Sequence, residues 1–280
     1  MIDSLNVSVP VTDLDVRLNQ PSGYPDQLAA SDTIEAMFAA GARDFPSYLL
    51  IPESDWQNKA QENDKYGTWP EDYSNRFTNQ NPTHECTCHA LTQGFEIAWN
   101  RQRKGKGDPV FVSPLSIYAE ANPGQWGGAT MQGTVGIAIR RGFLPDKLTP
   151  GAERFRHTLI GTCGRGNATQ SNGSWTPVSQ FPSGWQETAK HLRALEVINP
   201  TSYQQIVSLV LHGICVCVGR SGHAIPYTRV VWDGGQLRLK YKDSYDVFRY
   251  DSLNSVRAGV GGSYAIFTTT VPDDWDRPAG

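Results

Sequence analysis

The sequence has little of what would mark a membrane protein, a disulfide-stabilised protein or a nucleic-acid-binding protein. In its 280 residues no apolar run approaches the roughly 18 residues that a membrane helix needs. Its five cysteines are an odd number, which is unlike the disulfide framework of a small secreted domain. The net charge of −3 argues against a partner bound through phosphate groups. These absences favour a globular protein of a reducing compartment.

The N-terminus also shows no sign of a targeting segment. Residues 1–10 contain no positively charged region followed by an apolar core, so we expect no secretory signal. We therefore expect a cytoplasmic or virion-associated protein. We expect no cofactor and no membrane or nucleic-acid partner.

Two groups of residues have side chains that could bind a metal. They are His84, Cys86, Cys88 and His89 in one stretch, and Cys215 with Cys217 in another. The Cys-x-Cys spacing is tighter than that of structural zinc sites, where about two to four residues separate the cysteines. We therefore predict no metal site, and we interpret Cys88, His89, Cys215 and Cys217 as core or loop residues.

The first half of the chain shows mainly helical periodicity. Apolar residues at helical spacing predict helices over 86–100 and 129–141, and Ser113-Pro114 has the form of a cap followed by a first-turn proline. A strand over 7–14 and a helix from Ser31 or Asp32 to Gly41 are also expected. The polar stretch 53–81 predicts an ordered loop.

The second half changes to a period of two. After helical patterns at 185–195 and 203–211, alternating segments predict strands over 214–218, 224–232, 236–241 and 263–269. Residues 145–185 are rich in Gly, Ser, Thr and Pro and predict a long crossover. We therefore predict an α+β protein with a helical lobe, then an antiparallel β-sheet or barrel lobe, and a cleft between them.

The most informative residue is Cys86, which opens the helix predicted over 86–100. A thiol at a helix N-terminus meets the positive end of the helix dipole and unpaired N–H groups, and both favour the nucleophilic thiolate. Gln80 lies six residues earlier, where its amide could return to stabilise an oxyanion. His223 and Asp243, much later in the chain, could supply a base and a group that orients it.

The order of these segments resembles the papain family of cysteine peptidases, and most closely its bacterial and phage-borne branches. Those branches carry Asn-Gln-Gly and then Gly-Ser-Cys-Thr-Ala-Asn-Ala, and here Asn79-Gln80 leads to Glu85-Cys86-Thr87 with the same Gln-to-Cys spacing. The resemblance continues with a Ser-Pro helix start, a Gly-Gly pair, a His-Ala pair and an altered Asn-Ser-Trp-Gly. In this sequence these are Ser113-Pro114, Gly127-Gly128, His223-Ala224 and Asp243-Ser244-Tyr245-Asp246.

The resemblance implies a role for each matching position. Cys86 is the implied nucleophile, His223 the general base and then acid, and Asp243 the orienting group in place of the family's asparagine. Gln80 and the Cys86 backbone N–H form the implied oxyanion hole. The pair Gly127 and Gly128 is implied to bind an extended peptide. The implied division is an N-terminal extension over 1–64 and a papain-like domain over 65–280, with lobes over about 84–160 and 161–270.

Glu85 departs from the family's pattern directly before the nucleophile. If its carboxylate faced Cys86, charge repulsion would suppress the thiolate. We expect it to turn outward, because a carboxylate at a helix start is readily satisfied by exposed N–H groups and water. Two hypotheses result. One is an active thiol peptidase with a peptide or protein substrate, and the other is a weak or inactive structural or interaction protein of a phage virion.

Overall fold

The computed structural model describes residues 42–74, 80, 85–103, 109–121, 129–148, 181–220, 222–245 and 247–270. The strand predicted over 7–14, the helix predicted over 31–41 and most of the crossover lie outside these residues. None of the described helices is both long and apolar enough to cross a membrane.

The described residues form a seven-stranded sheet in the order β1-β2-β7-β3-β4-β5-β6. The strands are β1 (Ala42–Asp44), β2 (Ala194–Asn199), β3 (Val216–Arg220), β4 (His223–Asp233), β5 (Gln236–Asp243), β6 (Val247–Ser252) and β7 (Ser263–Thr269). β1 and β2 are parallel and the other neighbours are antiparallel. Strand β6 therefore lies at the sheet edge, next to β5.

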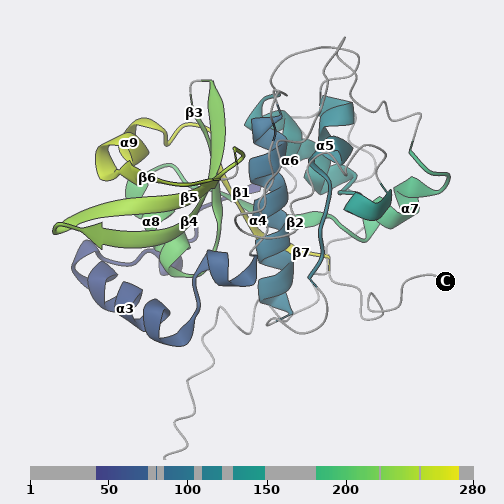
Figure 1. Cartoon of the computed structure of the whole chain (residues 1–280). Helices are drawn as coiled ribbons and strands as arrows, with labels where there is room; N and C mark the ends of the chain where they lie inside the picture. Colours follow the sequence, from purple (N-terminus) through teal and green to yellow (C-terminus); the bar gives the residue numbers. More distant parts are fainter. Residues whose placement is uncertain are drawn as a thin grey trace, which may run out of the picture.

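Helix α4 (Cys86–Gln102) lies between the sheet and the helices α5 (Pro114–Ala121) and α6 (Met131–Arg140) (Figure 1). Its residues from Thr87 to Asn100 are all buried, which is typical of a helix covered on every side. On one side Phe95 packs against Phe143, with ring centroids 4.5 Å apart. Such a packed helix gives its first residue a fixed position.

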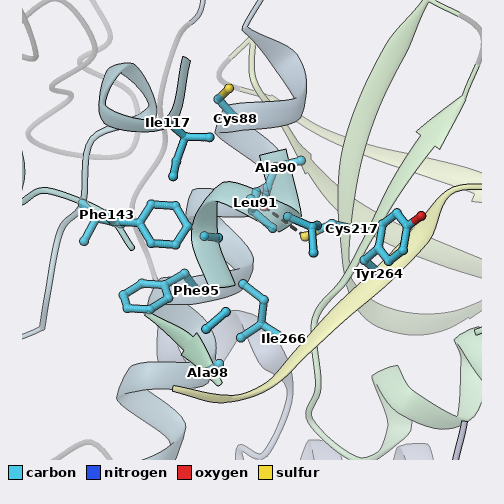
Figure 2. Packing of buried hydrophobic residues seen from close by; sticks show 14 of the residues in the cluster. Cys88, Ala90, Leu91, Phe95, Ala98, Ile117, Phe143, Cys217, Tyr264 and Ile266 are labelled. Atoms are coloured by element: carbon cyan, nitrogen blue, oxygen red, sulfur yellow. Dashed lines mark hydrogen bonds between the residues drawn. The ribbon is translucent and has the colours of Figure 1, made fainter. Parts of the chain in front are cut away.

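The sheet contacts α4 closely through β3. Cys217 donates a hydrogen bond from its thiol to the Ala90 carbonyl oxygen, over 3.1 Å (Figure 2). A Cβ added to Gly94 would lie only 2.8 Å from the Cys217 sulfur, so glycine permits this approach. The predicted core role of Cys217 agrees with its complete burial.

The other helices complete the two sides of the molecule. Near the β4–β6 part of the sheet lie α3 (Trp56–Tyr66), α8 (Tyr203–Leu211) and α9 (Leu253–Ala258), whereas α7 (Trp185–Lys190) lies beyond α5 and α6 (Figure 1). Short 3-10 helices cover Ser47–Leu49, Glu53–Asp55, Pro70–Tyr73 and Asp146–Leu148. The helical first part and mainly antiparallel second part confirm the predicted α+β class.

Several predicted elements need correction. The stretch 53–81 is not only loop, because α3 occupies Trp56–Tyr66 and buries Trp56, Ala60 and Asn63 at helical spacing on a mostly polar helix. The helix predicted over 185–195 ends at Lys190, since the following residues pair as β2 with β7. β1, β6 and α9 were not predicted, because short or exposed segments carry a weak hydrophobic period. β2 was also not predicted, because the helix predicted over 185–195 extended into its first residues.

Part of the predicted N-terminal extension packs on the β lobe. β1 pairs with β2, and α3 contacts α8. Trp56 and Ala60 belong to the same core cluster as Ile206 and Leu209. The domain boundary at residue 64 stays a prediction, but residues 42–64 do not form a separate unit in the described structure.

Candidate active site

Cys86 is the first residue of α4 and is half-buried. It lines a pocket between α4, the start of α6 and the loop that joins β3 to β4, together with Gln80, Met131 and His223. Among the described cysteines, Cys88, Cys215 and Cys217 are also free thiols but are buried. Cys86 is therefore the described thiol with access to solvent.

His223 opens β4, immediately after Gly222, whose φ of +77° permits the turn from β3. Because β4 and β5 are antiparallel, the start of β4 lies near the end of β5, where Asp243 stands. His223 Nε2 and Asp243 Oδ1 are 2.9 Å apart and share a hydrogen bond. The sheet topology thus brings together two residues that are far apart in sequence.

The same imidazole lines the pocket together with Cys86, and the two side chains interact. Because Nε2 faces Asp243, Nδ1 is the ring nitrogen available to the thiol. The hydrogen bond to Asp243, followed by the interaction with Cys86, raises the pKa of His223 to about 9 against the opposing effect of burial. At neutral pH the ring is therefore held as imidazolium.

Asp243 is itself 3% exposed. Burial alone would raise the pKa of its carboxyl group, but the hydrogen bond and charge of His223, with the charge of Arg249, outweigh burial and hold that pKa below its usual value. Arg249 Nε lies 2.7 Å from Asp243 Oδ2. Arg249 was not predicted from the sequence, although an aspartate at an asparagine position would have been a reason to look for a cation.

Tyr245 covers the imidazole at the mouth of the pocket. Its ring is stacked on His223, with centroids 5.5 Å apart and planes inclined by 20°. It stands at the position that matches the family's tryptophan and also lines the pocket. The stacked ring limits how far His223 can rotate and reduces the access of water to its bond with Asp243.

Gln80 is buried in the wall of the pocket. Its backbone N–H donates to the Ser244 carbonyl over 2.8 Å, and its Oε1 accepts a hydrogen bond from the Ser244 hydroxyl. The hydroxyl thereby fixes Oε1 as the acceptor end of the amide, and the NH₂ group is its donor end. Ser244, which orients Gln80, directly follows Asp243, which is hydrogen-bonded to His223. One short segment therefore orients two predicted site residues, Gln80 and His223.

The predicted outward orientation of Glu85 is wrong. Glu85 is 1% exposed. Its Oε2 lies 3.9 Å from Nε2 of His89, one helical turn later and also buried. The i, i+4 spacing brings these two side chains together beneath the helix start. After burial, which has the largest effect, the Glu85 charge contributes to raising the pKa of the buried Cys88 thiol.

The remaining predictions concern a substrate-binding glycine pair and metal binding. Gly127 and Gly128 lie outside the described residues. Within the described part of the chain, no group of three or more His, Cys, Asp or Glu residues is placed to hold a metal ion.

No model of a known protein family and no curated protein sequence matches this chain. Solved structures do. Xylellain, a cysteine protease from Xylella fastidiosa, matches with a TM-score of 0.52 and 14% identity, over 70% of this chain and 83% of that chain. The chain has a papain-like fold.

Two further structures share this papain-like fold. Digestive procathepsin L 3 of the Tenebrio molitor larval midgut has a TM-score of 0.51 and 12% identity, over 86% of this chain and 80% of that chain. A recombinant stem bromelain precursor has a TM-score of 0.50 and 13% identity, with the same two coverages of 86% and 80%. At such identities the likeness shows the fold alone, and it does not single out a bacterial or phage-borne branch.

Proposed function

We propose that this chain is a thiol peptidase that hydrolyses peptide bonds of a peptide or protein substrate. The observation that carries the proposal is the position of the His223 ring, which lines one pocket with Cys86 and is hydrogen-bonded to Asp243 over 2.9 Å. A thiol, an imidazole and an orienting carboxylate in one open pocket are the groups that acyl transfer requires.

In the proposed reaction, Cys86 acts as a thiolate paired with the protonated His223 ring, and its sulfur attacks the substrate carbonyl carbon. The resulting oxyanion accepts hydrogen bonds from the Gln80 NH₂ group and the Cys86 backbone N–H, which at the first helical position has no partner within the helix. His223 then protonates the leaving amine. It next takes a proton from the water that hydrolyses the thioester, and Cys86 is regenerated.

Thiol labelling combined with a hydrolysis assay tests the proposal. Iodoacetamide at neutral pH should modify Cys86 before Cys88, Cys215 and Cys217, because Cys86 is the accessible thiol of the four and has an imidazolium beside it. Hydrolysis of a fluorescently labelled casein should stop in proportion to Cys86 labelling, as followed by peptide mapping. Labelling of Cys86 no faster than the buried thiols, or casein hydrolysis that survives complete labelling, would overturn the proposal.

A second candidate is a structural or interaction protein, for example of a phage virion, that keeps the fold without turnover. The buried Glu85 carboxylate, one residue before Cys86, is the observation that favours it. Glu85→Gln distinguishes the two candidates, because it removes the charge at nearly constant shape. A tenfold or larger gain in the Cys86 alkylation rate would indicate a suppressed thiol and favour the second candidate, whereas an unchanged rate favours the peptidase.

Gln80→Ala is expected to lower kcat by about 10²–10³-fold, the usual loss when one oxyanion donor is removed. The KM value should change little, because the oxyanion forms only during reaction. Gln102→Ala is the matched control, since Gln102 lies at the other end of α4 and bonds to Thr269 on β7. Equal kcat values for wild type and Gln80→Ala would remove Gln80 from the mechanism.

A further inference from the structure

Both oxygen atoms of the Asp243 carboxylate are engaged. Oδ1 lies 2.9 Å from Nε2 of His223, and Oδ2 lies 2.7 Å from Nε of Arg249. These contacts come from opposite sides of β5, because β4 carries His223 and β6 carries Arg249. A carboxylate held at both oxygens cannot rotate without breaking one of the two contacts.

Arg249 is well placed to act on a buried group from the surface. It pairs with Tyr241 in the register of β5 and β6, two residues before Asp243, so its long side chain reaches diagonally along the strand. Its side chain is 55% exposed and that of Asp243 only 4%. The guanidinium therefore meets water on one side and the buried carboxylate on the other.

The charged and titratable groups around Asp243 show why a cation with a constant charge is needed beside its carboxylate. Facing the carboxylate are His223 from β4, Arg249 from β6, and the phenol groups of Tyr241 and Tyr245. Across the ring, His223 also faces Cys86 from α4. His223 is positive in only one of its protonation states, and it loses the proton when it protonates a leaving amine. Arg249 keeps its charge throughout.

We propose that Arg249 is a positioning residue of this site, which holds the Asp243 carboxylate against His223 and offsets its charge, so that an aspartate can replace the asparagine of the family pattern. This inference rests on the proposed peptidase function. Arg249 touches neither substrate nor thiol in the proposed reaction. It acts through Asp243 alone.

Removing Arg249 should change two measurable properties. Without the guanidinium, the carboxylate stabilises the imidazolium more strongly, so the pKa of His223 should rise. The basic limb of the profile of kcat against pH should therefore move upward by about half a pH unit or more. The exposure of the Arg249–Asp243 pair reduces the size of this shift. The kcat value should fall about tenfold, because the imidazolium gives up its proton less readily and the carboxylate is less fixed. The KM value should stay within about twofold.

The experiment is a double-mutant cycle between Arg249→Gln and Asp243→Asn, with kcat and KM measured across pH. In the Asp243→Asn background there is no carboxylate charge to offset, so the second substitution should change kcat less than about twofold and leave the pH limb in place. Arg238→Gln is the matched control, because Arg238 pairs with Asp233 over 3.2 Å at the surface of β5. An equal loss in both backgrounds, or an unmoved limb in Arg249→Gln, would overturn the inference.

An NMR titration of the His223 ring keeps this test separate from the test of function. The ring signal is assigned by its loss in His223→Ala, and its pKa should rise in Arg249→Gln and stay unchanged in Arg238→Gln. Absence of Cys86-dependent hydrolysis would refute the peptidase, while an unchanged His223 pKa would refute the role of Arg249. Arg249→Lys keeps the charge and loses the Nε contact, so it should retain the wild-type pH limb with part of the kcat loss.

Discussion

Replacing Cys86 with alanine is expected to abolish peptide hydrolysis, with a loss in kcat on the order of 10⁶-fold, as when the nucleophile of a comparable hydrolase is removed. The reason is that no acyl-enzyme can form, and the remaining oxyanion donors stabilise only the uncatalysed attack of water. The fold should be retained, since Cys86 is only half-buried. Casein hydrolysis and a thermal melt of the same sample measure both effects.

Cys88→Ala is the control for the loss of a thiol from the same helix. Cys88 is fully buried in the core cluster around α4, so its removal should cost about 1 kcal/mol of stability and leave the turnover of the folded protein unchanged. Hydrolysis that persists in Cys86→Ala, or that is lost equally in Cys88→Ala, would contradict the assignment of Cys86 as nucleophile.

The second large effect is expected from His223→Ala, which should lower kcat on the order of 10⁴–10⁶-fold because the proton acceptor of the thiol and the acid for the leaving amine are both lost. In the wild type, the raised pKa of about 9 keeps the ring protonated at neutral pH, so activity should fall as pH rises through about 9. This basic limb should be missing from the residual activity of His223→Ala.

His191→Ala is a suitable control, since His191 is an exposed residue at the end of α7, away from the pocket. It should keep both the wild-type rate and the basic limb. A limb near pH 9 in His223→Ala would show that another group controls the profile. Adding Cys86→Ala to His223→Ala should cause little further loss, because the two residues act as a unit.

The sequence by itself determined the class of the fold and most of the elements that carry the site. The helical period of 86–100 and the alternation of 263–269 are local patterns, and each agrees with the observed α4 or β7. Cys86 at a helix start, His223 at a strand start and Asp243 near a strand end were identified by residue type, order and resemblance. These features depend on neighbours in sequence, so the spacing of apolar residues along the chain is enough to predict the elements that carry them.

Only the tertiary structure decided how charged groups pair around the site. Glu85 was expected in water and is buried against His89, because packing around α4 encloses these two side chains while Cys86 between them stays half-buried. Arg249 reaches Asp243 because β6 pairs with β5, a neighbour relation that its own exposed strand does not encode. Strand order and burial depend on contacts distant in sequence, and these contacts decide whether a charge meets water, a counter-charge or a reactive thiol.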